Sequence, residues 1–185
     1  MMDYQTAVRG AFFDIAGVAE TPDEVAAQAR YLDDGLLFLQ EGKIIALLPW
    51  HEGETFLHPL KGYVDLRGKL LLPGFVDAHV HYPQTEMIGA FGEQLLEWLT
   101  TYTFPVESQF ADAEYAQEIA QFFVNQLISH GTTTALVFCT LHPASVEALF
   151  SEALRLNMRL IAGKVMRDRH VPDYLCETAG ESYEQ

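Results

Sequence analysis

From residue 73 onward the sequence alternates strand-like and helix-like segments, and this alternation limits the fold more than any other feature. Three apolar, β-branched segments predict strands, at residues 75–81, 132–140 and 158–166. Apolar residues at helical spacing predict helices at residues 93–100, 113–130 and 143–156. Strands separated by helices run parallel, with the helices packed on the sheet. Residues 73–185 are therefore expected to form an α/β domain.

The number of strands limits how complete that domain is. A (β/α)8 barrel takes eight strands and about 250 residues, so three strands cannot close one. Either the sheet stays open or further strands lie outside this chain.

Residues 1–72 follow a different pattern, of short strands and tight turns. The expected strands lie at residues 7–15, 36–39, 44–48, 63–66 and 69–72, with a hairpin turn at residues 40–43. One helix interrupts them, because Thr21 offers an N-cap, Pro22 a first helical residue and Glu24 a capping-box carboxylate. We expect that helix to end near Gly35. The predicted domains are thus residues 1–72 and residues 73–185.

The chain is acidic, with 11 Lys and Arg against 26 Asp and Glu and a formal net charge of −15. A protein that grips nucleic-acid phosphates needs the opposite balance. No apolar run reaches the roughly 18–20 residues that cross a bilayer, and residues 1–5 lack the basic and apolar regions of a leader. Cys139 and Cys176 offer neither a disulfide framework nor a CxxC pair. We expect a cytoplasmic protein that binds neither nucleic acid nor membrane.

The segment Asp77-Ala78-His79-Val80-His81 carries the strongest chemical signal. Side chains alternate along a strand, so His79 and His81 project from one face about 6.5 Å apart, close enough to share a metal ion. Asp77 lies on that face too, where it can orient a ligand. Seven histidines in 185 residues give such a pair by chance in roughly one chain in four. The position adds weight, because the pair ends the first strand of a βα series, where parallel α/β folds bind ligands.

With these residues the sequence resembles the amidohydrolase superfamily, whose members carry a β-sandwich domain beside a metal-dependent barrel. Within it, the sequence is similar to the guanine deaminase family through His81-Tyr82-Pro83-Gln84 and through four further segments, at residues 89–99, 102–105, 131–135 and 163–166. The resemblance covers nearly the whole chain from Gly35 onward. It implies an α/β fold in which the first three strands of a (β/α)8 TIM-like barrel follow part of a small β-sandwich domain.

The resemblance also implies a chemistry, the zinc-dependent hydrolysis of guanine to xanthine and ammonia. It assigns His79 and His81 to the zinc ion, and His81 and Gln84 to guanine. A glutamine both donates and accepts hydrogen bonds, which suits a purine edge, although without the family Gln84 would be an ordinary loop amide. The family's other zinc ligands and its proton-shuttling glutamate come from later strands. We therefore expect no catalytic residue within this chain, and no activity from the chain alone.

Two other functions stay open on the sequence. The chain is either a non-catalytic module that pairs with another subunit, or an amidohydrolase that acts on another aminated heterocycle; a homo-oligomer is possible in each case. His142, which ends the second strand, either lines the pocket or simply precedes a helix, and it is left out of the metal set. Trp98, Phe122 and Phe123 are expected in the core. Zinc deaminases with H-x-E and P-C-x-x-C motifs are excluded, because the chain has neither motif.

Overall fold

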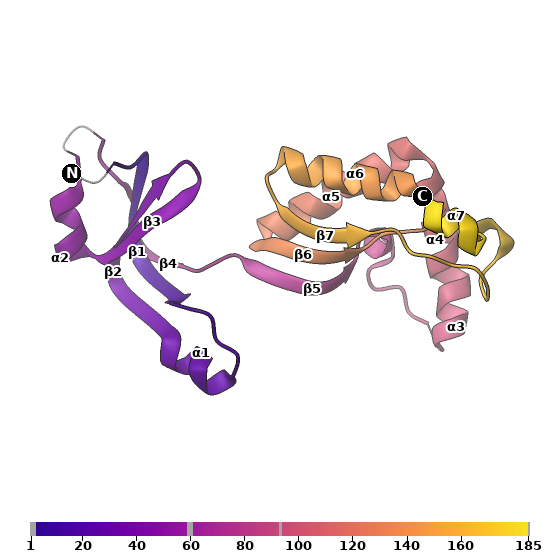
Figure 1. The fold of residues 1–185 in the computed structure, drawn as a ribbon, viewed down its shortest axis with the longest axis horizontal. Coiled ribbons are helices and arrows are strands. Elements are labelled where there is room, and N and C mark those ends of the chain that lie inside the picture. Colours follow the sequence, from indigo (N-terminus) through magenta and orange to yellow (C-terminus); the bar gives the residue numbers. More distant parts are fainter. Residues whose placement is uncertain (1–2, 59–60, 93, 185) are drawn as a thin grey trace. The chain divides into compact units, whose positions relative to one another are not determined.

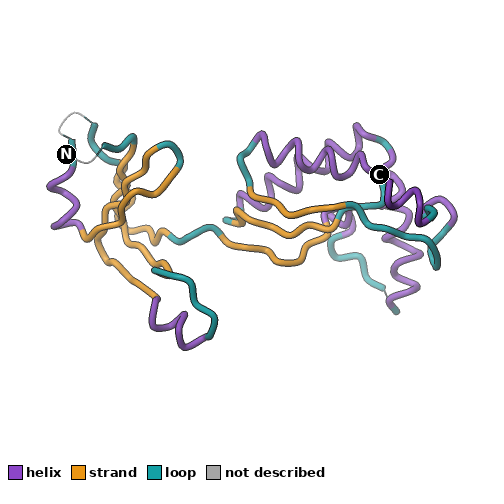
Figure 2. The backbone as a smooth tube through the Cα atoms, viewed as in Figure 1, coloured by secondary structure: helices purple, strands orange, loops and turns teal. Residues whose placement is uncertain are grey.

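The computed structural model describes residues 3–58, 61–92 and 94–184. The chain divides into two compact units, Met1–Pro73 and Gly74–Gln185, each with its own sheet (Figure 1). Figure 2 shows strands dominating the first unit, and strands and helices alternating in the second. The fold is therefore mixed α/β.

The first unit is built on one four-stranded sheet of order β3-β2-β1-β4. Its strands are β1 (Thr6–Ile15), β2 (Ala29–Gln40), β3 (Lys43–Pro49) and β4 (Val64–Leu71). Strand β2 pairs antiparallel with both β1 and β3, whereas β4 runs parallel to β1. The short helices are α1 (Pro22–Gln28), α2 (Trp50–Gly53) and η1 (Glu54–Phe56). A small core of Tyr4, Ala7, Leu36 and Phe38 packs this sheet.

The hairpin expected at residues 35–49 is confirmed by the pairing of β2 with β3. Its two turn residues, Glu41 and Gly42, have positive φ angles of 49° and 72°, the backbone that two-residue hairpin turns require.

The helix expected at Thr21 begins as predicted, but it ends earlier than predicted. Thr21 and Glu24 form the capping box, yet α1 stops at Gln28 and not near Gly35. Residues 29–34 instead join β2, because they pair with β1 and gain charged cross-strand contacts. Arg30 bonds Asp14 with distances of 2.9 and 2.5 Å. Tertiary pairing thus overrides the helical pattern after Gln28.

The two strands expected around Gly68 form one strand, β4. Gly68 has a φ of 82°, and the pairing of β4 with β1 shifts register between Arg9 and Ala11. A glycine in this backbone region allows a local kink without ending the strand.

The second unit contains a three-stranded parallel sheet of order β5-β6-β7. Its strands are β5 (Phe75–His81), β6 (Thr132–Phe138) and β7 (Arg159–Gly163), close to the predicted segments. The crossover helices are α5 (Ala113–Ser129) and α6 (Pro143–Arg155), which lie together on one face of the sheet (Figure 1). The predicted βαβαβ order is confirmed for this unit.

The main core of the second unit lies between the sheet and these two helices. Helix α5 buries one stripe, made of Ala116, Ile119, Ala120, Phe123 and Val124, as an amphipathic helix should. From β6, Ala135 and Val137 point into the same core. Alternate residues of the strands therefore point to the opposite face, which carries the candidate site.

Further helical turns lie around the carboxyl ends of the strands. After β5 come η2 (Tyr82–Met87), α3 (Leu95–Trp98), the π-helical turn η3 (Leu99–Thr103), α4 (Phe104–Ser108) and η4 (Gln109–Ala111). After β7 come η5 (Asp173–Leu175) and α7 (Ala179–Glu184). Phe104, Leu141 and Leu175 join these segments in a small separate core. The helix expected at residues 93–100 is thus a longer helical run from Leu95 to Ser108; Glu93 lies outside the described residues.

Two of the three aromatic residues expected in the core lie elsewhere. Phe123 is buried, as predicted. Phe122, its neighbour on α5, is 53% exposed, because the helix turns it away from the sheet. Trp98 is half-buried and belongs to no hydrophobic cluster among the described residues.

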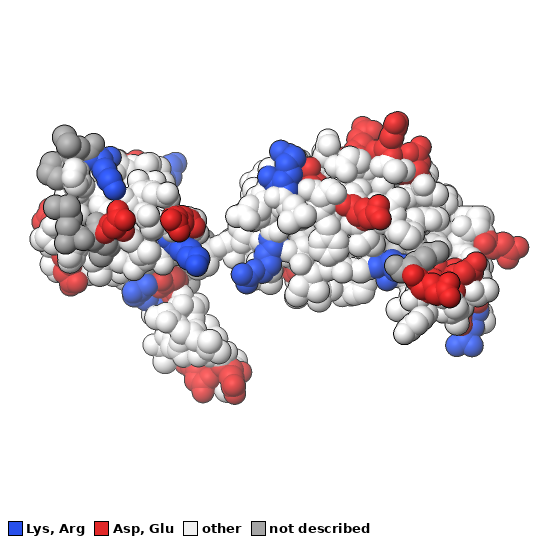
Figure 3. Space-filling view, turned by 45° about the horizontal axis from the view of Figure 1, so that its top comes forward, with Lys and Arg blue, Asp and Glu red and all other residues white. Residues whose placement is uncertain are grey.

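Acidic side chains lie on the surface of both units. Figure 3 shows Asp and Glu on both units, with Lys and Arg in separate places between them on the face drawn. No helix in the described residues is long and apolar enough to cross a membrane.

Candidate metal and substrate site

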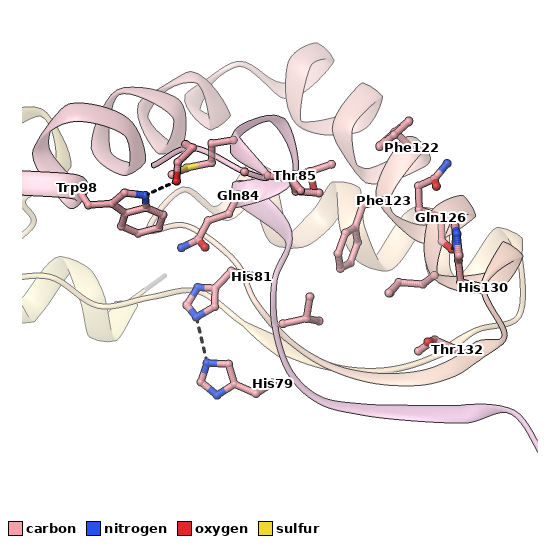
Figure 4. A pocket seen from close by; sticks show the side chains of 16 residues that line it. His79, His81, Gln84, Thr85, Trp98, Phe122, Phe123, Gln126, His130 and Thr132 are labelled. Atoms are coloured by element: carbon pink, nitrogen blue, oxygen red, sulfur yellow. Dashed lines mark hydrogen bonds between the residues drawn. The ribbon is translucent and has the colours of Figure 1, made fainter. Parts of the chain in front are cut away.

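His79 and His81 converge at the carboxyl end of β5. Between them, Val80 packs against the core under α5 and α6, so both imidazoles project from the opposite face of the sheet. Their Nε2 atoms lie 3.2 Å apart (Figure 4). As predicted from the sequence, the two imidazoles project from one face and bring two nitrogen donors together.

Three neighbours fix the geometry of this pair. Phe138, which lies opposite His81 on β6, stacks on the His81 ring with a centroid distance of 4.8 Å and contacts the His79 ring at 4.7 Å. Asp77 Oδ1 accepts a hydrogen bond of 3.1 Å from the backbone N–H of His79. Tyr82 is fully buried, and its hydroxyl donates to the carbonyl oxygen of Ala116 on α5. The strand end is therefore anchored on both sides of His81.

The donor set fits a divalent metal ion such as zinc. Two nitrogens at the usual zinc distance of about 2.0–2.1 Å and at a tetrahedral angle lie about 3.3 Å apart. The observed 3.2 Å between the Nε2 atoms matches that separation. The described residues hold no cluster of three or more His, Cys, Asp or Glu side chains able to bind a metal. The two imidazoles are therefore the candidate metal donors that these residues bring together.

The electrostatics favour the neutral, ligating form of His81. Burial lowers the pKa of His81, and the neighbouring His79 lowers it further. A metal ion binds only the unprotonated imidazole nitrogen. The strand end therefore holds His81 in the state that a metal requires.

A pocket of about 670 Å³ opens beside this pair. One end is lined by His79, His81, Gln84 and Trp98, and the other by residues of α5 and the start of β6 (Figure 4). Gln84 belongs to η2, two residues after the buried Tyr82, and its side chain reaches toward the space between Trp98 and His81 (Figure 4). The structure thus brings His79, His81 and Gln84 to one pocket.

His142 is not among the residues that line this pocket. The loop after β6 is held by Ser145, whose fully buried hydroxyl donates to the carbonyl oxygen of His142 at 2.8 Å and accepts from Thr140 Oγ1 at 2.9 Å. Burial lowers the pKa of His142. His142 therefore stands at the N-cap position of α6, outside the lining of this pocket.

Residues 70–185 match the amidohydrolase family. The match covers more than half of the sequence and includes the whole second unit. The chain belongs to the amidohydrolase family. The His-x-His pair at the end of β5 therefore lies within the part of this amidohydrolase that the family match covers.

The relatives of this amidohydrolase chain include several guanine deaminases. It is 53% identical over 179 residues to the guanine deaminase of Escherichia coli K12, which aligns 97% of the chain but 41% of that relative. It is 40% identical over 120 residues to the guanine deaminase of Dictyostelium discoideum, which aligns 64% of the chain and 27% of that relative. The chain thus spans less than half the length of these relatives.

Solved structures agree with the sequence relatives. The E. coli guanine deaminase structure superposes with a TM-score of 0.92 at 52% identity, covering 97% of this chain and 41% of that one. The guanine deaminase of C. acetobutylicum, solved with guanine bound in its active site, superposes with a TM-score of 0.79 at 28% identity, covering 97% and 40%. The fold of this amidohydrolase chain is therefore that of a portion of these enzymes.

Sequence reasoning missed two side chains of the site, Phe138 and Trp98. Phe138 could have been found from strand register, since it ends the strand that neighbours His81. Trp98 lies on a short helix seventeen residues after His81, and its position depends on the loop before it. The sequence does not predict this loop conformation, so the orientation of the indole toward the pocket is known only from the structure.

Proposed function

We propose that the chain is part of a zinc-dependent guanine deaminase, which hydrolyses guanine to xanthine and ammonia. The observation that carries this proposal is the pair of Nε2 atoms 3.2 Å apart at the end of β5, in one pocket with Gln84. The 53% identity to a guanine deaminase supports the choice of substrate. In this proposal residues 73–185 are the first βα units of a (β/α)8 barrel, and residues 1–72 are part of a small β-sandwich domain.

His79 and His81 would hold the zinc ion. A bound zinc ion supplies Lewis-acid chemistry and activates water as a nucleophile near neutral pH. Phe138 stacks on the His81 ring and contacts the His79 ring, and the Asp77 carboxylate accepts a hydrogen bond from the backbone N–H of His79. These residues would hold the two imidazoles in place for the metal ion.

Gln84 would orient the purine, and His81 would contact it from the metal side. The Gln84 carbonyl accepts a hydrogen bond from a ring N–H or amino group, and its NH₂ donates to a ring nitrogen. Its place beside the histidines suits an amide that holds the heterocycle with its amino-bearing carbon toward the metal. Zinc sites in catalysis commonly have three or more protein ligands. The remaining ligands and the proton-shuttling groups would come from residues outside this chain.

An activity assay tests the proposal. The complete gene product and the 185-residue chain are purified with zinc, and guanine loss and ammonia release are measured for each. We expect one ammonia per guanine from the complete product, and no turnover from the chain alone. His79→Ala and His81→Ala should abolish both turnover and zinc binding, whereas His51→Ala, an exposed histidine of the first unit, should change neither.

Other outcomes would contradict the proposal in different ways. Turnover of another aminated heterocycle, but not of guanine, would favour a different amidohydrolase substrate. No hydrolysis by a zinc-loaded, folded complete product would favour a non-catalytic module.

A further inference from the structure

The indole of Trp98 forms an apolar wall at the metal end of the pocket. It lines the pocket together with His81 and Gln84, and in Figure 4 the Gln84 amide points into the space between the indole and the His81 imidazole. A flat aromatic surface, an amide and a pair of metal-binding nitrogens therefore surround one space.

The indole is held in one orientation by the loop before it. Trp98 Nε1 donates a hydrogen bond of 3.3 Å to the carbonyl oxygen of Ala90. Gly92 lies directly against the ring, since a Cβ at residue 92 would come within 2.5 Å of Trp98 Cβ and 2.7 Å of Cγ. The loop thus wraps the tryptophan closely, and this close approach requires a residue without a side chain.

A core role does not account for this tryptophan. Trp98 is half-buried and lies outside the three hydrophobic clusters of the described residues. Its helical neighbours Leu95 and Leu96 are exposed, at 68% and 77%. A π-helical turn, a feature found frequently at functional sites, follows it directly. A large aromatic side chain, fixed but incompletely covered, is well suited to bind a planar ligand.

We propose that Trp98 is a substrate-contact residue on which the planar heterocycle stacks. This inference rests on the proposed function and extends it, because it names the residue that selects a flat bicyclic ring. Stacking on the indole and hydrogen bonding to Gln84 constrain the ring in perpendicular directions. Stacking would fix the plane of the ring, and hydrogen bonds to Gln84 would fix its position within that plane.

Steady-state kinetics of the complete gene product test this role. Stacking contributes equally to the bound substrate and to the transition state, so its loss raises KM and leaves kcat nearly unchanged. From the usual strength of base–aromatic stacking, Trp98→Ala should raise KM for guanine about 10- to 100-fold. Trp98→Phe should restore most of the affinity, whereas Trp98→Leu, apolar but not aromatic, should not. Trp50→Phe, in the first unit, serves as the matched control and should leave KM unchanged.

A second variant tests the position of the ring without removing it. Gly92→Ala places a methyl group where the indole now lies, so it should raise KM in the same direction as Trp98→Ala. Thermal melts of each variant show whether it is folded.

The possible failures are distinguishable. An active parent enzyme with KM changed less than twofold by Trp98→Ala, or restored as well by Leu as by Phe, overturns the stacking role and leaves the proposed function standing. A folded, zinc-loaded parent that does not deaminate guanine overturns the proposed function, and the stacking role with it.

Discussion

The ion pair between Lys164 and Glu177 is one of two in the described part of the second unit whose side chains are both mostly buried, so its loss should clearly lower the free energy of unfolding. Lys164 directly follows β7, and its Nζ lies 2.7 and 2.6 Å from the two carboxylate oxygens of Glu177. The two side chains are only 11% and 5% exposed. Ser182 Oγ also donates to Glu177, at 2.6 Å. The pair thus ties the end of the sheet to the C-terminal segment.

Lys164→Met keeps most of the aliphatic stem and removes the charge. Breaking a buried pair from one side usually costs about 3–5 kcal/mol, because it leaves the other charge buried. Here Glu177 can instead take up a proton, which at pH 7 costs about 3.4 kcal/mol for a glutamate with its ordinary pKa of 4.5. Proton uptake therefore limits the loss, and we expect about 3 kcal/mol at pH 7. At pH 5 protonation costs only about 0.7 kcal/mol, so the loss should fall to about 1 kcal/mol.

Urea unfolding at the two pH values measures this loss. The chain has two tryptophans, Trp50 in the first unit and Trp98 in the second, so a Trp50→Phe background lets fluorescence follow the second unit alone. Adding Glu177→Gln to Lys164→Met should recover part of the stability, because no charge is then left buried.

Arg169→Met supplies the matched control in the same segment. It removes an exposed pair with Asp168, 3.7 Å apart, whose side chains are 76% and 57% exposed. Such a pair contributes at most about 1 kcal/mol. A stability loss from Lys164→Met no larger than that from Arg169→Met, or equal at pH 5 and pH 7, would show that no buried charge is left unpaired.

Three further predictions concern the same unit. Ser145→Ala removes the fully buried hydroxyl that links Thr140 to His142, and should lower the free energy of unfolding by about 1–3 kcal/mol; an unchanged urea midpoint would contradict this. Burial alone would raise the pKa of Glu177, but hydrogen bonds from Lys164 and Ser182 hold it below its usual value. Stability from this pair should be full above about pH 4.5 and decline as the pH falls through the lowered folded-state pKa; a flat acid profile in urea melts would be inconsistent with it. Gln84→Ala should raise KM for guanine about 5- to 10-fold in the complete gene product, by loss of hydrogen bonds to the ring, and an unchanged KM would remove Gln84 from the site.

The secondary structure of the second unit was predicted well, because the spacing of apolar residues in its sequence matches the side chains that its sheet and helices bury. Val80 packs into the core between His79 and His81, and α5 buries the stripe that its spacing indicates. The position of His79 and His81 on one face follows from strand geometry alone. Their separation of 3.2 Å does not, since it depends on the stacking of Phe138 from the next strand.

The first unit was less predictable because pairing partners decide its structure. Residues 29–34 continue a helical pattern in the sequence. In the structure they form a strand, because they pair antiparallel with β1 and because Arg30 forms an ion pair with Asp14. Trp98 was misplaced for a related reason. Its apolar character predicts burial, but a loop that closes on it at Ala90 and Gly92 turns the ring toward the pocket.

The most direct test of the central claim is to locate the metal. Crystals of the complete gene product, grown with zinc, are measured on both sides of the zinc absorption edge to give an anomalous difference map. We expect one strong peak within bonding distance of Nε2 of both His79 and His81, beside Gln84. A peak bonded to other residues, or an enzyme that turns over guanine without a metal at this pair, would contradict it.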